Sequence, residues 1–139
     1  MNWKFCILFF LLIVETFPAR AAESTNQQKT AKTQIIRRVG VEDFAALAAE
    51  RNAVIVDVRT PREFESGHIK NAVNADFLDA SFESRLTKLD KSKTCLVYCA
   101  GGARSARACK KMSQNGFSRL VDLAPGIAGW KTAKKPLVK

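Results

Sequence analysis

The sequence predicts an α/β domain built on a mainly parallel sheet. Two short apolar runs, "AVIVDV" at residues 53–58 and "TCLVYC" at 94–99, have the composition of strands that are buried on both faces. A third such run, "RLVDL", spans residues 119–123. Segments with helical character separate these runs, and this alternation is typical of parallel sheets that are covered by helices.

The other elements fit around these three strands in one domain. We expect, in chain order, a strand at 33–39, a helix at 41–52, a short helix at 79–86, a helix at 105–115 and a last short helix at 126–133. Gly116 follows the fourth of these elements, in the position where glycine often ends a helix. The sequence shows no internal repeat. We therefore place a single domain at residues 33–135 and a basic C-terminal tail at 136–139.

Residues 1–21 have the pattern of a secretory signal peptide. After a positively charged start, residues 5–14 form an uninterrupted apolar run, and the final "ARA" has small residues where signal peptidase cleaves. An uncleaved membrane anchor is the alternative. A spanning helix needs about 20 apolar residues, and Glu15 and Pro18 interrupt this run. We therefore expect a periplasmic or secreted protein without stable membrane insertion after cleavage.

Composition limits the partners of the remaining chain. Residues 22–32 are polar and predict a disordered lead-in to the domain. The chain has 23 basic and 13 acidic residues and a formal net charge of +10, which attracts small anions. Because no basic run alternates with aromatic residues, no nucleic-acid partner is expected. His68 is the single histidine, which argues against a histidine metal site.

Three cysteines lie beyond the signal peptide, and an odd number is unusual in an exported protein, where cysteines normally pair. Cys95 and Cys99 are four residues apart on one expected strand, which separates them by about 13 Å. Cys99 and Cys109 are also expected to exceed the roughly 7 Å limit for a disulfide. We therefore expect Cys95 and Cys109 to be buried core thiols, with Cys109 on a helix face beside Ala106 and Ser113.

Cys99 ends a buried strand, the position at which parallel sheets usually carry their sites. A glycine-containing loop that runs into a helix aims several backbone N–H groups at one centre, and such groups lower the pKa of a thiol. A free cysteine is often only a small core residue, but that role requires no such loop. We therefore predict a nucleophilic Cys99 in an open pocket, with an anion cradle formed by the backbone of Ala100, Gly101, Gly102, Ala103 and Ser105.

Two segments resemble rhodanese-type sulfurtransferase domains. In one of them, Cys99 is followed by Gly102 and Arg104, then by a helix and a Gly-Phe pair at 116–117. In the other, "DVRTPREFESGHIKNAVN" at 57–74 is similar to the family's Asp-x-Arg, Glu-Phe and Gly-His-Ile pattern. The two motifs occur in the family's order, and the resemblance extends over the whole predicted domain.

The resemblance implies a single rhodanese-like domain with a five-stranded parallel sheet and helices on both faces. It implies that Cys99 takes sulfur from a small anionic donor such as thiosulfate and passes it from a persulfide to a thiol or cyanide, with no cofactor. Arg104 is then a second catalytic residue, which binds the donor's sulfonate or braces the loop. Asp57 and Arg59 give structural support near the site. The alternative is a rhodanese-fold sulfur carrier or protein-binding module in the envelope with little turnover. In either case we expect a monomer.

Loop length distinguishes sulfur transfer from the phosphatase chemistry of related domains. Phosphatase loops place five residues between cysteine and arginine, whereas four separate Cys99 from Arg104. The shorter ring favours a single sulfur atom over a tetrahedral phosphate. Glu63 and His68 receive no catalytic role, because a persulfide mechanism needs no dedicated base. Asn71 stands where the family usually has glycine, so the local turn there is expected to differ.

Overall fold

The structure is a computed structural model, and it describes residues 34–139. The predicted signal peptide at 1–21 and lead-in at 22–32 lie outside the described residues. The elements, in chain order, are β1 (Ile35–Val39), α1 (Val41–Ala48), β2 (Ala53–Asp57), α2 (Pro61–Glu65), β3 (Val73–Asn74), α3 (Phe82–Leu86), β4 (Thr94–Tyr98), α4 (Ala103–Gln114), β5 (Arg119–Leu123) and α5 (Gly126–Thr132). Within the described part of the chain, no helix combines the length and apolar content needed to cross a membrane.

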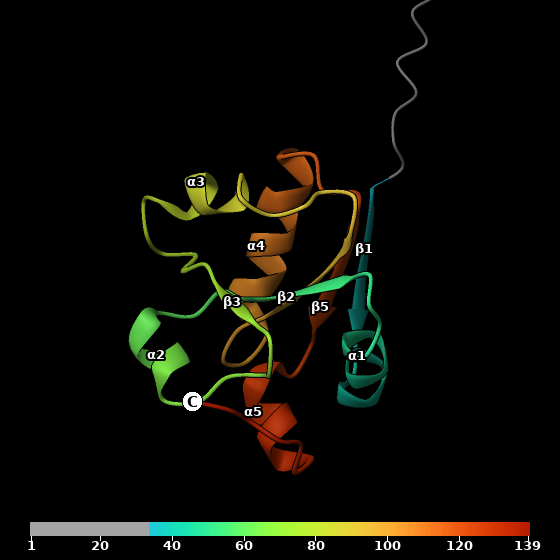
Figure 1. Cartoon of the computed structure of the whole chain (residues 1–139), viewed down its shortest axis with the longest axis vertical. Helices are drawn as coiled ribbons and strands as arrows, with labels where there is room; N and C mark the ends of the chain where they lie inside the picture. The colour runs from blue at the N-terminus through green and yellow to red at the C-terminus, as the bar shows by residue number, and fades with distance from the viewer. Residues whose placement is uncertain (1–33) are drawn as a thin grey trace, which may run out of the picture. The chain divides into compact units, whose positions relative to one another are not determined.

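The five strands form one sheet in the order β1-β5-β4-β2-β3, and every neighbouring pair is parallel. Helices cover both faces of this sheet, with α3 and α4 on one side and α1 and α5 on the other (Figure 1). The predicted fold class is therefore confirmed. Parallel strands need crossover connections, and the helices supply them.

Alternate side chains of β4 point to opposite faces and divide the core into two clusters. Cys95 and Val97 are buried against α3 and α4, while Leu96 and Tyr98 are buried against α1 and α5. Residues 95–98 of β4 are fully buried on both faces, because β4 lies at the centre of the sheet. Burying each of its large apolar side chains contributes about 1.5–3 kcal/mol.

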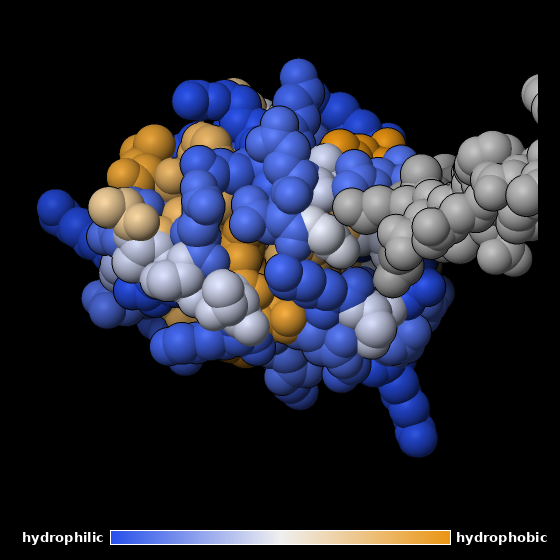
Figure 2. All heavy atoms as spheres, turned by 90° about the horizontal axis from the view of Figure 1, so that it is seen from above, coloured by the Kyte–Doolittle hydropathy of each residue, from blue (hydrophilic) through white to orange (hydrophobic). Residues whose placement is uncertain are grey.

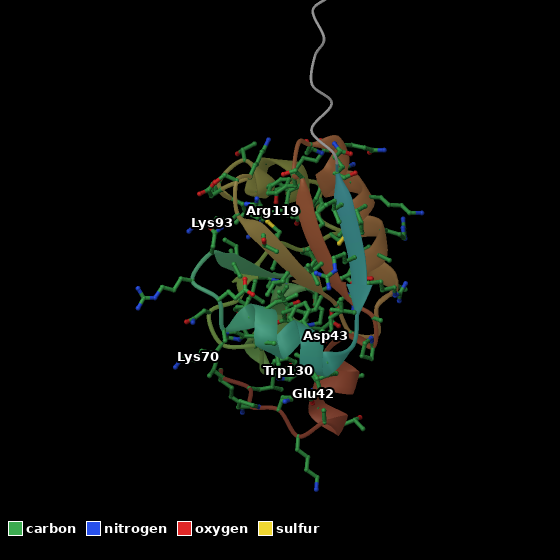
Figure 3. The ribbon with its side chains drawn as sticks, turned by 90° about the vertical axis from the view of Figure 1, so that its right-hand side faces the viewer. Glu42, Asp43, Lys70, Lys93, Arg119 and Trp130 are labelled. Atoms are coloured by element: carbon green, nitrogen blue, oxygen red, sulfur yellow. The ribbon has the colours of Figure 1, made fainter. Side chains whose placement is uncertain are left out.

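An aromatic contact joins α1 and α5. The ring of Phe44 meets Tyr98 and Trp130 edge-on, with ring centroids 6.4 Å and 6.2 Å apart. Figure 3 shows Trp130 beside α1, at the opposite end of the molecule from Lys93 and Arg119. Because Lys93 precedes β4 and Arg119 begins β5, the α5 end of the molecule is the carboxyl end of these strands.

Two short elements were not placed by the sequence pattern. The edge strand β3 has only two residues, in which Val73 pairs with Val56 of β2, and this length is too short for a periodic signal. The five-residue helix α2 begins with Pro61 after a reciprocal capping box formed by Thr60 and Glu63. The fifth strand implied by the family resemblance is therefore this edge strand.

Helix α4 begins earlier than predicted, at Ala103 instead of residue 105, because the left-handed Gly102 caps it directly. Its buried side chains are Ser105, Ala108, Cys109 and Met112. Cys109 is thus buried as predicted, but the prediction was wrong to group it with residues 106 and 113, which are only partly buried. The i, i+3, i+4, i+7 spacing of the observed face is the usual one for a helix packed on a sheet.

The last residues pack against the domain, which the prediction of a tail at 136–139 did not include. The backbones of Val138 and His68 exchange two hydrogen bonds of 2.9 Å, and the Trp130 indole donates to the Pro136 carbonyl. Figure 1 shows the C-terminus beside α2.

The turn at Asn71 has a φ of 65°, the left-handed conformation that glycine takes easily and that asparagine tolerates.

One face of the molecular surface is largely hydrophilic, with small apolar areas between the polar side chains (Figure 2).

Candidate active site

The Cys99 loop leaves the carboxyl end of β4 and is held by the first turn of α5. The backbone N–H of Ile127 donates to the Cys99 carbonyl at 2.8 Å, and that of Ala128 donates to the Ala100 carbonyl at 3.1 Å. These bonds fix the loop between two secondary-structure elements that are distant in the sequence. A nucleophile on such a loop is positioned by the rigid sheet beneath it.

Two glycines are required by the close packing of this loop. Gly102 has a φ of 91°, and a Cβ on it would collide with the Ala124 carbonyl oxygen. Gly126 has a φ of 57°, and a Cβ there would lie 2.5 Å from the Ala100 carbonyl oxygen. Gly101, in contrast, has no atom within 4 Å of a Cβ position. The loop therefore depends on Gly102 and Gly126 and tolerates a side chain at Gly101.

Backbone donors surround the sulfur of Cys99. The Gly102 N–H donates to Cys99 Sγ at 3.1 Å. Burial alone would raise the pKa of the Cys99 thiol, but the Ser105 hydroxyl and the N–H groups of Ser105, Gly102 and Gly101 outweigh burial and lower that pKa. The site therefore favours an anionic sulfur chiefly through hydrogen-bond donors of the loop.

The five predicted cradle residues do not contribute equally. Gly101, Gly102 and Ser105 supply N–H groups that stabilise the thiolate. The Ala100 carbonyl instead accepts the bond from α5, and Ala103 begins α4 with an exposed side chain. Because the helix starts at Ala103, Ser105 donates from the first turn, where backbone N–H groups are free of intrahelical partners.

The pocket is less open than the small loop side chains predicted. Cys99 is only 1% exposed and belongs to the apolar cluster beneath α4. The prediction of an open pocket does not hold for the sulfur itself, because Cys99 packs in the core against residues of β2, β5 and α4 that are distant in the sequence. The sulfur is therefore both a core atom and the centre of the donor cradle.

The other two cysteines are free and completely buried, as predicted. Burial raises the pKa of the Cys95 thiol to about 11 and that of the Cys109 thiol to about 12. Within residues 34–139, Cys99 is thus the one cysteine whose surroundings favour the thiolate. Among these residues, no group of three or more potential metal ligands lies together.

Arg104 forms a two-pronged ion pair with Glu63 of α2, with both N···O distances at 2.8 Å. Glu63 also accepts hydrogen bonds from the N–H and hydroxyl of Thr60. The Arg104 hydrogen bond is the main cause that lowers the pKa of the Glu63 carboxyl to about 2. This ion pair links α4 to α2, which is consistent with bracing, and both predicted roles of Arg104 stay predictions.

Glu63 is a site residue that sequence reasoning left without a role. The available signal was the capping box "TPRE", which orients the Glu63 carboxylate at the start of α2. The partner of that carboxylate lies 41 residues further along the chain. Only the fold brings the two together.

Asp57 and Arg59 form a second ion pair, at the carboxyl end of β2. Two nitrogens of the Arg59 guanidinium bind the Asp57 carboxylate, with the shortest bond at 2.6 Å, and Arg59 also donates to the Gly67 carbonyl at 2.9 Å. Asp57 is 0% exposed and Arg59 is 3% exposed. The pair ties together the turns after β2 and α2, which is a structural role.

Comparisons with known proteins agree with this geometry. The family model of the rhodanese-like domain matches residues 40–133. A sulfurtransferase from Allochromatium vinosum is 33% identical over 92 residues, which cover 66% of this chain and 84% of that protein. A thiosulfate sulfurtransferase from Coxiella burnetii is 34% identical over 85 residues, which cover 61% of this chain and 78% of that protein.

Among solved structures, a rhodanese-related protein from Thermoplasma volcanium superimposes with a TM-score of 0.65 at 30% identity. The superposition covers 73% of this chain and 97% of that one. The family match, the parallel sheet and the cysteine loop at its carboxyl end are mutually consistent. The chain belongs to the family of rhodanese-like domains.

Proposed function

We propose that this chain is a sulfurtransferase that carries a sulfane sulfur on Cys99 as a persulfide. The observation that carries the proposal is the Gly102 N–H bond to Cys99 Sγ at 3.1 Å, within a loop that lowers the pKa of the Cys99 thiol. A thiolate is the nucleophilic form of cysteine. The same N–H groups stabilise the anion of the persulfide, whose outer sulfur also carries negative charge.

The proposed reaction has two displacement steps. In the first step, the Cys99 thiolate attacks the outer sulfur of thiosulfate, the donor's sulfur–sulfur bond breaks, and sulfite leaves with the bonding electron pair. In the second step, cyanide or a thiolate attacks the outer sulfur of the persulfide. The new bond yields thiocyanate or an acceptor persulfide, and the electron pair returns to Cys99 as the thiolate. Neither step needs an external oxidant or reductant.

Two features of the loop favour a small sulfur donor. Cys99 is 1% exposed, so a bulky donor has less access to the sulfur than a small one. The four residues between Cys99 and Arg104 form a shorter ring than the five of a phosphatase loop. Sulfurtransferases among the relatives, one of them named for thiosulfate, support the same class of donor.

The proposed location is the periplasm or the exterior of the cell, and the proposed state is a monomer. The signal-like pattern of residues 1–21 supports export. The positive net charge of the chain favours the approach of small anionic donors such as thiosulfate. Cell fractionation followed by N-terminal sequencing of the purified protein would test both the location and the cleavage.

Sulfur transfer from thiosulfate to cyanide is the direct test, with wild type measured beside Cys99→Ser. We expect wild type to form thiocyanate and Cys99→Ser to form none above the buffer rate. After thiosulfate alone, intact-protein mass spectrometry should show the mass of one added sulfur atom, located on Cys99. Cys109→Ala is the matched control, because it removes a buried thiol whose pKa is about 12 and should keep the activity.

Two outcomes would contradict the proposal in different ways. Equal inactivity of wild type and Cys99→Ser, with no added sulfur on Cys99, would reject a persulfide mechanism with this donor. A persulfide that forms on Cys99 but passes to neither cyanide nor a small thiol would reject turnover. That second result would instead support a sulfur carrier that needs a protein acceptor.

A further inference from the structure

A buried carboxyl group on β5 plays no part in the site described above. Asp122 is 1% exposed and pairs in the sheet with Val97 of β4 and Arg38 of β1. Its side chain points to the same face of the sheet as that of Leu120, two residues earlier, which packs in the α4-side cluster together with Cys99. Neither carboxyl oxygen of Asp122 accepts a hydrogen bond from any residue in the described range. Because burying a carboxyl group with no hydrogen bond is unfavourable, Asp122 requires an explanation.

Ser105 belongs to the buried face of α4, which packs over the side of the sheet that carries Leu120 and Cys99. It is 0% exposed in the first turn of α4, and its Oγ, like both carboxyl oxygens of Asp122, makes no hydrogen bond within the described residues. Gly102, three residues before Ser105, donates its N–H to Cys99 Sγ at 3.1 Å. The Ser105 hydroxyl lowers both the pKa of the Asp122 carboxyl and the pKa of the Cys99 thiol. A hydroxyl has one proton to donate, so Ser105 can serve only one of these acceptors at a time.

The other groups that face Asp122 set the balance between its two charge states. Burial raises the pKa of the Asp122 carboxyl, against the Ser105 hydroxyl and the Arg38 guanidinium, which lower it. Arg38 Nε lies 3.5 Å from Asp122 Oδ2 and is half exposed. From α4, Cys109 faces the carboxyl, and Cys95 of β4 lies in the same cluster. Burial keeps both thiols neutral at ordinary pH.

We propose that Asp122 is a positioning residue that directs the Ser105 hydroxyl toward Cys99 when the carboxyl is protonated and away from Cys99 when it is ionised. In the protonated state, the carboxyl O–H donates to Ser105 Oγ, and Ser105 donates to the sulfur. In the ionised state, Ser105 donates to the carboxylate, and the sulfur keeps only its backbone donors. The effect on thiol ionisation is independent of catalysis, whereas its use in stabilising a persulfide rests on the proposed function.

The ionisation of Cys99 can be followed directly by thiolate absorbance near 240 nm and by the rate of iodoacetamide alkylation. In a chain without residues 1–21, which include Cys6, only Cys99 contributes between about pH 5 and pH 9, because the pKa values of Cys95 and Cys109 are about 11 and 12. We expect Asp122→Asn to raise the alkylation rate about fivefold near neutral pH, because the amide leaves Ser105 free to donate to the stronger acceptor, the thiolate. Ser105→Ala should lower the rate.

The double variant separates this mechanism from a direct charge effect. If Asp122 acts through Ser105, Asp122→Asn should change nothing once Ser105→Ala is present. Removal of a nearby negative charge would instead raise the alkylation rate equally in both backgrounds. That result, or an unchanged rate in the single variant Asp122→Asn, would overturn the proposal.

Arg38→Gln supplies a second test that keeps Asp122 and alters an exposed side chain, in case Asp122→Asn does not fold. Loss of Arg38 favours the protonated carboxyl, so the proposal predicts faster alkylation of Cys99. Loss of a nearby cation acting directly on the thiolate predicts slower alkylation, and slower alkylation would overturn the proposal. Because neither readout involves sulfur transfer, a failure of the proposed function would appear separately, in the thiosulfate assay.

Discussion

Two turns at the same edge of the sheet stabilise charge in opposite ways. After β2, the carboxylate of Asp57 is neutralised by the guanidinium of Arg59, and both side chains are buried. After β4, the sulfur of Cys99 is stabilised chiefly by hydrogen-bond donors of its own loop. Both strands are central and parallel, so their different loops, not their positions, create the difference.

The comparison shows why one turn is structural and the other is suited to chemistry. A buried pair whose hydrogen-bonding groups are satisfied has no remaining capacity for a ligand, and breaking it exposes an uncompensated charge. A sulfur stabilised by fixed backbone dipoles keeps its lone pairs reactive and can exchange its bonding partner without a change in the surrounding loop. The following predictions test this contrast, from the largest expected effect to the smallest.

Arg59→Ala should lower the free energy of unfolding by about 3–5 kcal/mol, because it leaves Asp57 buried without its partner. Urea unfolding followed by circular dichroism measures this change. The Cys99 thiolate titration of the folded variant should remain close to wild type. Arg62→Ala, which alters an exposed arginine of α2, is the control and should stay within about 0.5 kcal/mol. A large shift in the Cys99 titration would show that the two turns are not separate.

Gly102→Ala should lower the free energy of unfolding by about 2–4 kcal/mol, because its φ is left-handed and the new Cβ meets a backbone carbonyl. The displaced N–H should also raise the pKa of the Cys99 thiol, which thiolate absorbance measures. Gly101→Ala is the matched control in the same loop, since a Cβ there meets nothing within 4 Å. Equal effects of the two substitutions would contradict the packing described for Gly102.

The sequence alone was sufficient for most of the fold. The central strands were predictable because burial on both faces leaves continuous apolar runs, as in residues 53–58 and 94–99. Strand β3 was not predictable from the sequence. Its two residues pair with the backbone of β2 but are too few to show an apolar pattern of their own. Helix α2 was missed as a helix although Thr60 and Glu63 carry its capping signal, because five residues are too few for a periodic face.

The candidate site was predictable only in its local part. Cys99, Gly102 and Ser105 are close in sequence, so one loop contains both the nucleophile and its donors. The groups that act on this loop from outside are distant in the chain. Glu63 lies 41 residues from Arg104, and the carboxyl of Asp122 comes from another strand. The burial of Cys99 likewise results from packing with residues of β2, β5 and α4, which no local pattern encodes.

Arg104→Lys tests whether the ion pair braces the loop. A lysine keeps the charge but loses the two-pronged contact with Glu63, so we expect about 1 kcal/mol less stability and about a fivefold lower kcat/KM for thiosulfate. Glu63→Gln should lower kcat/KM in the same direction, because it removes the other half of the brace. A rise in kcat/KM for Glu63→Gln would contradict this and show that Glu63 competes with the donor for Arg104.

The smallest effect is the pH dependence of the Arg104–Glu63 pair. The pKa of Glu63 is lowered from its usual value of 4.5 to about 2 in the folded chain, chiefly by the hydrogen bond from Arg104. The pair therefore contributes its full stability above about pH 4.5 and loses it as the pH falls toward about 2. Glu63 is 34% exposed, so solvent screening limits the contribution to less than about 1 kcal/mol.

Urea unfolding of wild type and Glu63→Gln, compared across this acid range, measures that contribution. Wild type should be the more stable near neutral pH, and the difference should shrink as the pH falls and disappear below about pH 2, where the carboxyl becomes protonated in both the folded and unfolded chain. Glu65→Gln is the control, because it alters an exposed carboxylate of the same helix and leaves the Arg104 pair intact. A difference between wild type and Glu63→Gln that persists at low pH would assign the stability to packing of the side chain, and α2 would then be held to α4 without help from charge.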